Sequence, residues 1–173
     1  MKTLKQLTCL IGFSILSSCG FELQNTGNLN EKIDSVYIQT VDPYSSFFRS
    51  IKDSLRNNGV IILDKRDEAS YILIIKEDIS SDRILSISAT NTPMEYEIAY
   101  QVVWSLFKGN QEVISDTKHI ETQDYSFDQN RLLGKRKEAE YLNDSLAIKI
   151  SKGVLLKLGS ILLWLHFILD IQR

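Results

Sequence analysis

This chain contains few cysteines and prolines and has little excess of charge of either sign. Its 173 residues include two cysteines, two prolines and eight glycines. So few prolines and glycines argue against a disordered or linker-rich chain. The 20 Lys and Arg residues nearly balance the 22 Asp and Glu residues, which gives a net charge of −2. A charge so near neutral provides no electrostatic basis for nucleic-acid binding.

Residues that carry catalysis are equally scarce. Histidine occurs twice, at His119 and His166, and neither has a second ligand at metal-binding spacing. No serine lies in a Gly-x-Ser-x-Gly turn, and the glycines are too scattered for a phosphate-binding loop. We therefore expect a protein that is not an enzyme and that uses no metal or cofactor. We expect His119 to be a solvated residue of a polar strand.

The N-terminus has the three parts of a secretion signal. Lys2 and Lys5 precede an apolar stretch over residues 7–16, which is too short to span a bilayer. The sequence Leu16-Ser17-Ser18-Cys19 then matches the lipobox of bacterial lipoproteins. We expect residues 1–18 to be removed and Cys19, then the sole cysteine, to carry a lipid. The alternative is an ordinary signal with a chance cysteine near its end.

The remaining 155 residues after removal of the first 18 make one domain. Residues 19–32 are expected to form a lipidated tether and residues 33–160 the folded domain. Alternating or apolar runs predict strands at 35–40, 60–63, 71–79 with 83–89, 95–107 and 113–122. Helical spacing predicts helices at 44–58 and from about residue 135. The expected fold is α+β: a two-layer sandwich with two helices on one face of a mostly antiparallel four-stranded sheet.

Two faces of these elements are specific enough to test. Alternate residues of the strand at 95–107 are apolar and should form the buried face: Tyr96, Ile98, Tyr100, Val102, Trp104 and Leu106. One stripe of the last helix is apolar at steps of three or four: Ala139, Leu142, Leu146, Ile150, Val154 and Leu158. We expect these two sets to meet in the core.

The last residues, 161–173, form a tail that begins with nine nearly all apolar residues. A run of this length is too short to cross a bilayer as a helix. It is either a long buried or interfacial extension of the last helix, or a segment that docks on a membrane or a partner.

A basic cluster precedes and opens the last helix: Arg131, Lys135, Arg136 and Lys137. The macrodipole disfavours cations at a helix N-terminus, so helix stability does not explain them. The cluster predicts an anionic partner such as a phosphorylated glycolipid. A solvated, charged turn is the alternative.

Several weak motifs occur in an order that resembles the LptE family of lipopolysaccharide-assembly lipoproteins. They begin with residues 16–23 around the lipobox and continue with Asp42-Pro43, residues 55–60 and Glu95-Tyr96. Residues 125–128 and the last helix follow in family order. The resemblance implies a two-layer domain that plugs the outer-membrane β-barrel protein LptD, assists its assembly and helps deliver lipopolysaccharide to the cell surface.

The resemblance also implies where lipopolysaccharide is bound and where the protein resides. Family members are thought to use a basic residue near the last helix, which Lys135 matches, and another at a sheet-tip turn. Residues 89–92 contain no cation, and Arg83 substitutes only if its strand brings it near. The expected location is the outer membrane, facing the periplasm, since Gly20 follows Cys19 in place of a retention aspartate. The alternatives are an accessory lipoprotein of a phospholipid transport system and a hydrolase, although the sequence nominates no catalytic residues.

Overall fold

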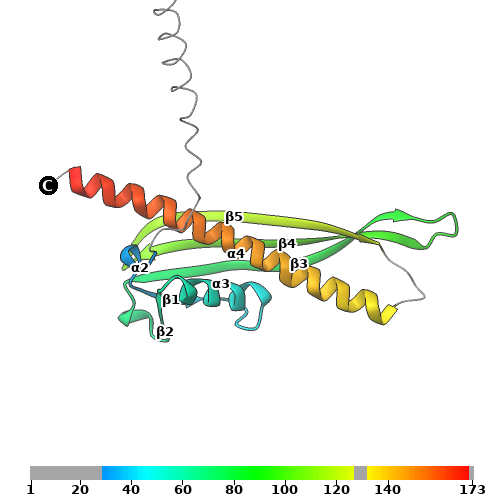
Figure 1. The fold of residues 1–173 in the computed structure, drawn as a ribbon, viewed down its shortest axis with the longest axis horizontal. Helices are drawn as coiled ribbons and strands as arrows, with labels where there is room; N and C mark the ends of the chain where they lie inside the picture. The colour runs from blue at the N-terminus through cyan, green and yellow to red at the C-terminus, as the bar shows by residue number, and fades with distance from the viewer. Residues whose placement is uncertain (1–28, 127–131, 172–173) are drawn as a thin grey trace, which may run out of the picture.

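A computed structural model describes residues 29–126 and 132–171 (Figure 1). Its elements are, in chain order, α2 (Leu29–Lys32), β1 (Ser35–Gln39), α3 (Ser46–Asn57), β2 (Ile61–Leu63), a 3-10 turn η1 (Arg66–Glu68), β3 (Tyr71–Ile87), β4 (Pro93–Lys108), β5 (Gln111–Ser126) and α4 (Leu132–Ile171). Helices α3 and α4 cover one face of a long, narrow sheet (Figure 1). The predicted signal and Cys19 lie outside the described residues.

The sheet has five strands in the order β2-β1-β3-β4-β5. Strand β1 pairs in parallel with both β2 and β3, while β3, β4 and β5 form an antiparallel meander. The α+β class is confirmed, but the prediction of four mostly antiparallel strands and two helices is wrong in its counts. Helix α3 forms a crossover that returns the chain parallel to β1, so residues 61–63 become an edge strand. The short α2 adds a third α-helix.

Strand β3 is continuous from Tyr71 to Ile87, whereas an interruption was expected near residues 80–82. Ser80, Ser81 and Asp82 instead pair in register with β4. Their low intrinsic strand propensity is outweighed because the residues before and after them in β3 also pair with β4. The irregularities lie elsewhere, between Ile75 and Glu77 and around Ser86.

The core lies between the helices and one face of the sheet. The predicted inner face of β4 is confirmed, with Trp104 and Val102 fully buried, and the predicted stripe of α4 is confirmed by Leu146 and Val154. Helix α3 contributes three buried side chains at helical spacing, Phe47, Ile51 and Leu55. Ser45 caps α3 by accepting a hydrogen bond from the Phe48 amide at 2.9 Å. Helix α3 ends at Asn57, one residue before its predicted end, and the positive φ of 78° at Gly59 suits glycine.

Helix α2 belongs to the folded body. Leu29 is only 1% exposed and packs in the same core as Ile33 and Leu162. The Lys32 Nζ also donates a hydrogen bond to the Gly159 carbonyl of α4 at 3.3 Å. The expected tether therefore ends before residue 29, because an apolar side chain at that position anchors the chain against α4. Among the described helices, none has the length and apolar character needed to span a membrane.

Candidate functional site

The basic cluster lies at the beginning of α4. Arg136 and Lys137 are exposed in the second turn of this helix, while Arg131 and the side chain of Lys135 lie outside the described residues. The first turn carries no acidic side chain to offset these cations. The helix dipole does not favour cations near this end of a helix, so helix stability does not explain the exposed pair.

Arg83 does not join this cluster. It forms an ion pair with Glu97, with 2.6 Å between Arg83 Nε and Glu97 Oε1. Glu97 alternates with the buried residues of β4 and so lies on the open face of the sheet, opposite α3 and α4. Asp124 of β5 is its cross-strand neighbour on the same face. Arg83 therefore lies on the face of the sheet away from α4, beside two carboxylates and four residues before β3 ends at Ile87.

The turn between β3 and β4 is the sheet tip at which the family resemblance implies a cation. The amide of Ser88 donates to the Thr92 carbonyl at 2.7 Å, and Asn91 has a positive φ of 60°. Large apolar side chains flank this turn instead of cations, with exposed fractions of 41–56%: Ile84, Leu85, Ile87 and Met94. Sequence reasoning missed this apolar tip, although the isoleucines and leucine were visible as a signal.

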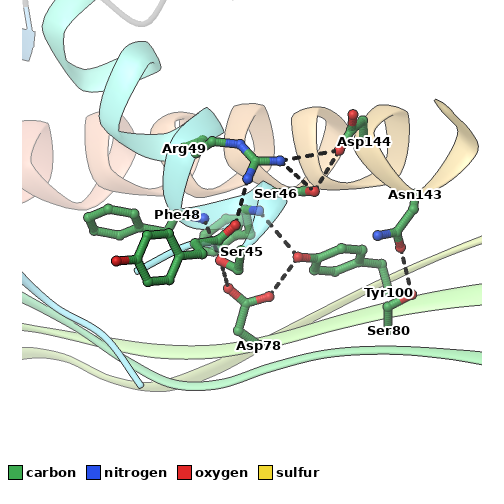
Figure 2. Close-up of polar contacts among 11 residues, drawn as sticks. Ser45, Ser46, Phe48, Arg49, Asp78, Ser80, Tyr100, Asn143 and Asp144 are labelled. Atoms are coloured by element: carbon green, nitrogen blue, oxygen red, sulfur yellow. Dashed lines mark hydrogen bonds and ion pairs between the residues drawn. The ribbon is translucent and has the colours of Figure 1, made fainter. Parts of the chain in front are cut away.

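A polar network joins the N-terminus of α3 to the sheet (Figure 2). The Asp78 carboxylate accepts hydrogen bonds from the Ser45 hydroxyl and, at 2.7 Å, from the Tyr100 hydroxyl. The Tyr100 oxygen in turn accepts from the Phe47 amide at 3.2 Å. Burial, reinforced by the bond to Asp78, raises the pKa of Tyr100 above its ordinary value. The network thus satisfies a phenol and a carboxylate below the helices and fixes α3 against β3 and β4.

A second set of polar contacts joins α3 to α4 (Figure 2). The Ser46 hydroxyl donates to Asp144 at 2.5 Å, and Arg49 lies 3.8 Å from the same carboxylate. Farther along the helices, the hydroxyls of Ser50 and Ser151 are 2.7 Å apart. A solvent-open groove between the two helices is lined by four of these residues, Ser46, Arg49, Ser50 and Asp144. The contacts set the position of α4, and with it the position of the basic cluster.

Neither polar network has the composition of a catalytic site. Serines lie beside Asp78 and Asp144, but no histidine accompanies them among the hydrogen bonds of the described residues. No group of three His, Cys, Asp or Glu side chains in the described part of the chain is placed to hold a metal ion. The chemistry available is therefore hydrogen bonding and charge pairing.

His119 is not the solvated residue that was expected. Its ring stacks on Trp104 with 6.2 Å between centroids, and its Nε2 is buried with no hydrogen-bond partner among the described residues. A methyl group on Gly153 of α4 would lie 3.3 Å from its Nδ1, so the helix backbone passes close to the ring at this glycine. Burial, with a smaller contribution from the charge of Lys157, lowers the pKa of His119. His119 thus contributes to the contact between α4 and β5.

Comparison with known proteins identifies the family. The model of a family described as "LptE: Lipopolysaccharide-assembly" matches residues 33–158, which is most of the chain. The chain belongs to the LptE family. This family consists of non-enzymatic lipoproteins of lipopolysaccharide assembly, so the expectation that the chain is not an enzyme is confirmed. The match covers β1 to β5, α3 and α4 as far as Leu158, and ends before the apolar tail.

Individual LptE relatives cover less of the chain. The LPS-assembly lipoproteins LptE of Yersinia pestis and Yersinia pseudotuberculosis are 32% identical over 84 residues, which are 47% of this chain. The match spans only 37% of those relatives' own length.

Solved structures show the same fold. The rare lipoprotein B of Shewanella oneidensis superposes with a TM-score of 0.66 at 25% identity, over 76% of this chain and 98% of that one. A lipoprotein B of Nitrosomonas europaea superposes with a TM-score of 0.65 at 22% identity, over 74% and 83% of the two chains.

Removing the Tyr100 hydroxyl tests whether the Asp78 network stabilises this LptE-family fold. Tyr100→Phe should lower the free energy of unfolding by about 1–3 kcal/mol, because the Phe47 amide and Asp78 each lose a buried partner. The measurement is urea unfolding followed by circular dichroism. Tyr44→Phe is the matched control, since Tyr44 is 83% exposed and its change should cost less than about 0.5 kcal/mol. Equal stability of both variants would contradict the structural role.

The half-buried His119 should make the fold less stable in mild acid. Because the folded chain lowers the pKa of His119, the unfolded chain binds the proton first as the pH falls below 6.5. Stability present above that pH is then lost as the pH falls through the folded-state pKa. His119→Phe keeps a ring beside Trp104 and removes the titrating group. Urea unfolding at a series of pH values should show a smaller acid loss in the variant, and an identical loss would refute the assignment.

Proposed function

We propose that this chain is an outer-membrane lipoprotein that plugs an LptD-like β-barrel, assists its assembly and helps deliver lipopolysaccharide to the cell surface. The observation that carries the proposal is the match of the lipopolysaccharide-assembly family over residues 33–158. The barrel partner and the outer-membrane location go beyond that match and are proposed here.

The surface of the domain supports a position inside a barrel. The interior of large outer-membrane barrels is polar and water-filled, so a plug needs a largely polar exterior. Strand β5 presents charged and polar side chains along its length, among them Lys118, Thr122 and Asp124. The open face of the sheet adds ion-paired charges, namely Lys76 with Asp116 and Arg83 with Glu97. Such a surface is compatible with the hydrated wall of a barrel lumen.

Lipopolysaccharide contact is proposed for the start of α4. Phosphate groups on the glycolipid are bound well by clustered cations, and Arg131, Lys135 and Arg136 lie together in sequence at this end of the helix. Arg136 is exposed and available to an incoming polyanion. Arg83 is a weaker candidate, because a ligand there must displace or share Glu97.

The lipid on Cys19 is proposed as the outer-membrane anchor. Cys19 precedes the first described residue by ten positions, so the chain between them provides a short tether. Multiple acyl chains hold a protein at a membrane stably, because each buried CH₂ contributes about 0.8 kcal/mol.

Co-purification tests the proposed partner. The chain, tagged at its C-terminus and expressed from its own promoter, should be recovered in mild detergent with a large β-barrel protein identified by mass spectrometry. A chain of matched size that carries the same signal and tag is the control for non-specific recovery. Recovery of the chain as a free monomer from cells that contain LptD would refute the plug. Recovery with a phospholipid transport complex would replace it with the accessory-subunit function.

Charge reversal tests the glycolipid contact. Lys135→Glu with Arg136→Glu should weaken lipopolysaccharide binding roughly tenfold or more, because two attractions of up to about 1 kcal/mol each become repulsions. The measurement is binding of purified chain to immobilised lipopolysaccharide at fixed salt. Lys149→Glu with Lys152→Glu makes the same change at exposed positions farther along α4. Equal binding by the two double variants would identify the cluster as a solvated turn.

A further inference from the structure

The C-terminal end of α4 is apolar and extends past the rest of the domain. No charged residue occurs between Lys157 and Asp170, an interval of twelve residues. The helix continues through this interval to Ile171 and runs beyond the end of the sheet near α2 (Figure 1). The family match has already ended at Leu158. Most of this segment therefore lies outside the part of the chain that matches the family.

The core of the domain includes the beginning of this segment. Leu158 and Leu162 are 1% and 5% exposed and belong to the cluster that includes Leu29 and Ile33. Residues 163–169 continue the same helix as an apolar run, and this end of α4 extends past the strands of the sheet (Figure 1).

The apolar run begins where the proposed lipid tether leaves the domain. Lys32 of α2 contacts the Gly159 carbonyl, which places the first described residues next to the start of the run. Leu29 follows Cys19 by ten positions, and an extended chain of that length reaches at most about 35 Å. A helix of seven residues, 163–169, is about 10 Å long. A bilayer that holds the lipid on Cys19 is thus within reach of the end of α4.

We propose that residues 161–169 lie in the interface of the same phospholipid bilayer that receives the Cys19 lipid, as a second membrane contact. The proposal rests on the lipidation included in the proposed function. Twelve uncharged helical residues span about 18 Å, against about 30 Å for the hydrocarbon core, so the segment lies in the interface and does not cross. Trp164 lies within the run, and tryptophan favours the membrane–water boundary. One lipid signal combined with an apolar helix anchors a protein more firmly than either alone.

Trp164 provides a direct test, because the other tryptophan, Trp104, is fully buried in the core. The full chain is purified from membranes and reconstituted into phosphatidylethanolamine vesicles with a minor share of phosphatidylglycerol. Some vesicles contain phospholipids brominated on the acyl chains. The expected result is a shift of Trp164 emission to shorter wavelength and loss of that emission in brominated vesicles. Trp164→Phe should abolish the loss, which assigns it to this side chain.

Matched variants separate an apolar contact from a general effect of charge. Leu165→Glu with Ile168→Glu should restore most of the Trp164 emission in brominated vesicles. Tyr141→Glu with Ile148→Glu changes two exposed side chains of the same helix, 72% and 46% exposed, and should leave the quenching unchanged. Equal quenching in both double variants would overturn the proposal.

The lipidation of Cys19 is measured separately by the mass of the N-terminal peptide. A lipidated chain whose Trp164 is not quenched refutes the second contact and leaves the anchor in place. Quenching in a Cys19→Ala chain, with no lipid attached, supports the second contact without the anchor. Shielding of Trp164 that appears only when a β-barrel partner is added, without quenching by brominated lipid, assigns the segment to protein and overturns the proposal.

Discussion

The apolar stripe of α4 lies along the row of buried side chains on β4, and this contact sets the position of most other features. Trp104, Val102, Leu146 and Val154 are all fully buried in it. Burial of a large apolar side chain contributes about 1.5–3 kcal/mol, so a row of them dominates the energetics of a single domain. The middle of α4 is held on the sheet, and its two ends extend from there, one with a basic sequence and one with an apolar sequence.

The polar contacts beneath and between the helices fix where the helices lie along the apolar surface of the sheet. A hydrophobic stripe alone permits sliding by a turn, whereas a hydrogen bond requires one geometry. Asp78 fixes the N-terminus of α3 through Ser45, and Asp144 fixes α4 on α3 through Ser46. The basic start of α4 is consequently presented at a defined place at one end of the domain, as recognition of a polyanion requires.

Periodicity predicted much of this arrangement, because the inner face of β4 and the stripe of α4 each repeat over many residues. It failed where an assignment depended on tertiary pairing. Residues 61–63 are too few to reveal a parallel partner, and Leu29 is a single apolar residue in a polar segment. The side of the sheet on which Arg83 lies depends on its register with Glu97. The surroundings of His119 include Gly153, thirty-four positions later in the sequence. Family motifs, in contrast, predicted the lipoprotein class from residue order alone.

Strand β5 has a paired neighbour on one side only within the described sheet, because it is the last strand in the order. Sixteen residues thus present a row of main-chain donors and acceptors, which invites edge-to-edge association between copies. Charged side chains recur along the strand, at Glu112, Asp116, Lys118, Glu121 and Asp124. Repulsion and desolvation of these charges oppose the stacking of one copy on another. The charges that oppose this association are the same charges that the proposed position in a hydrated lumen requires.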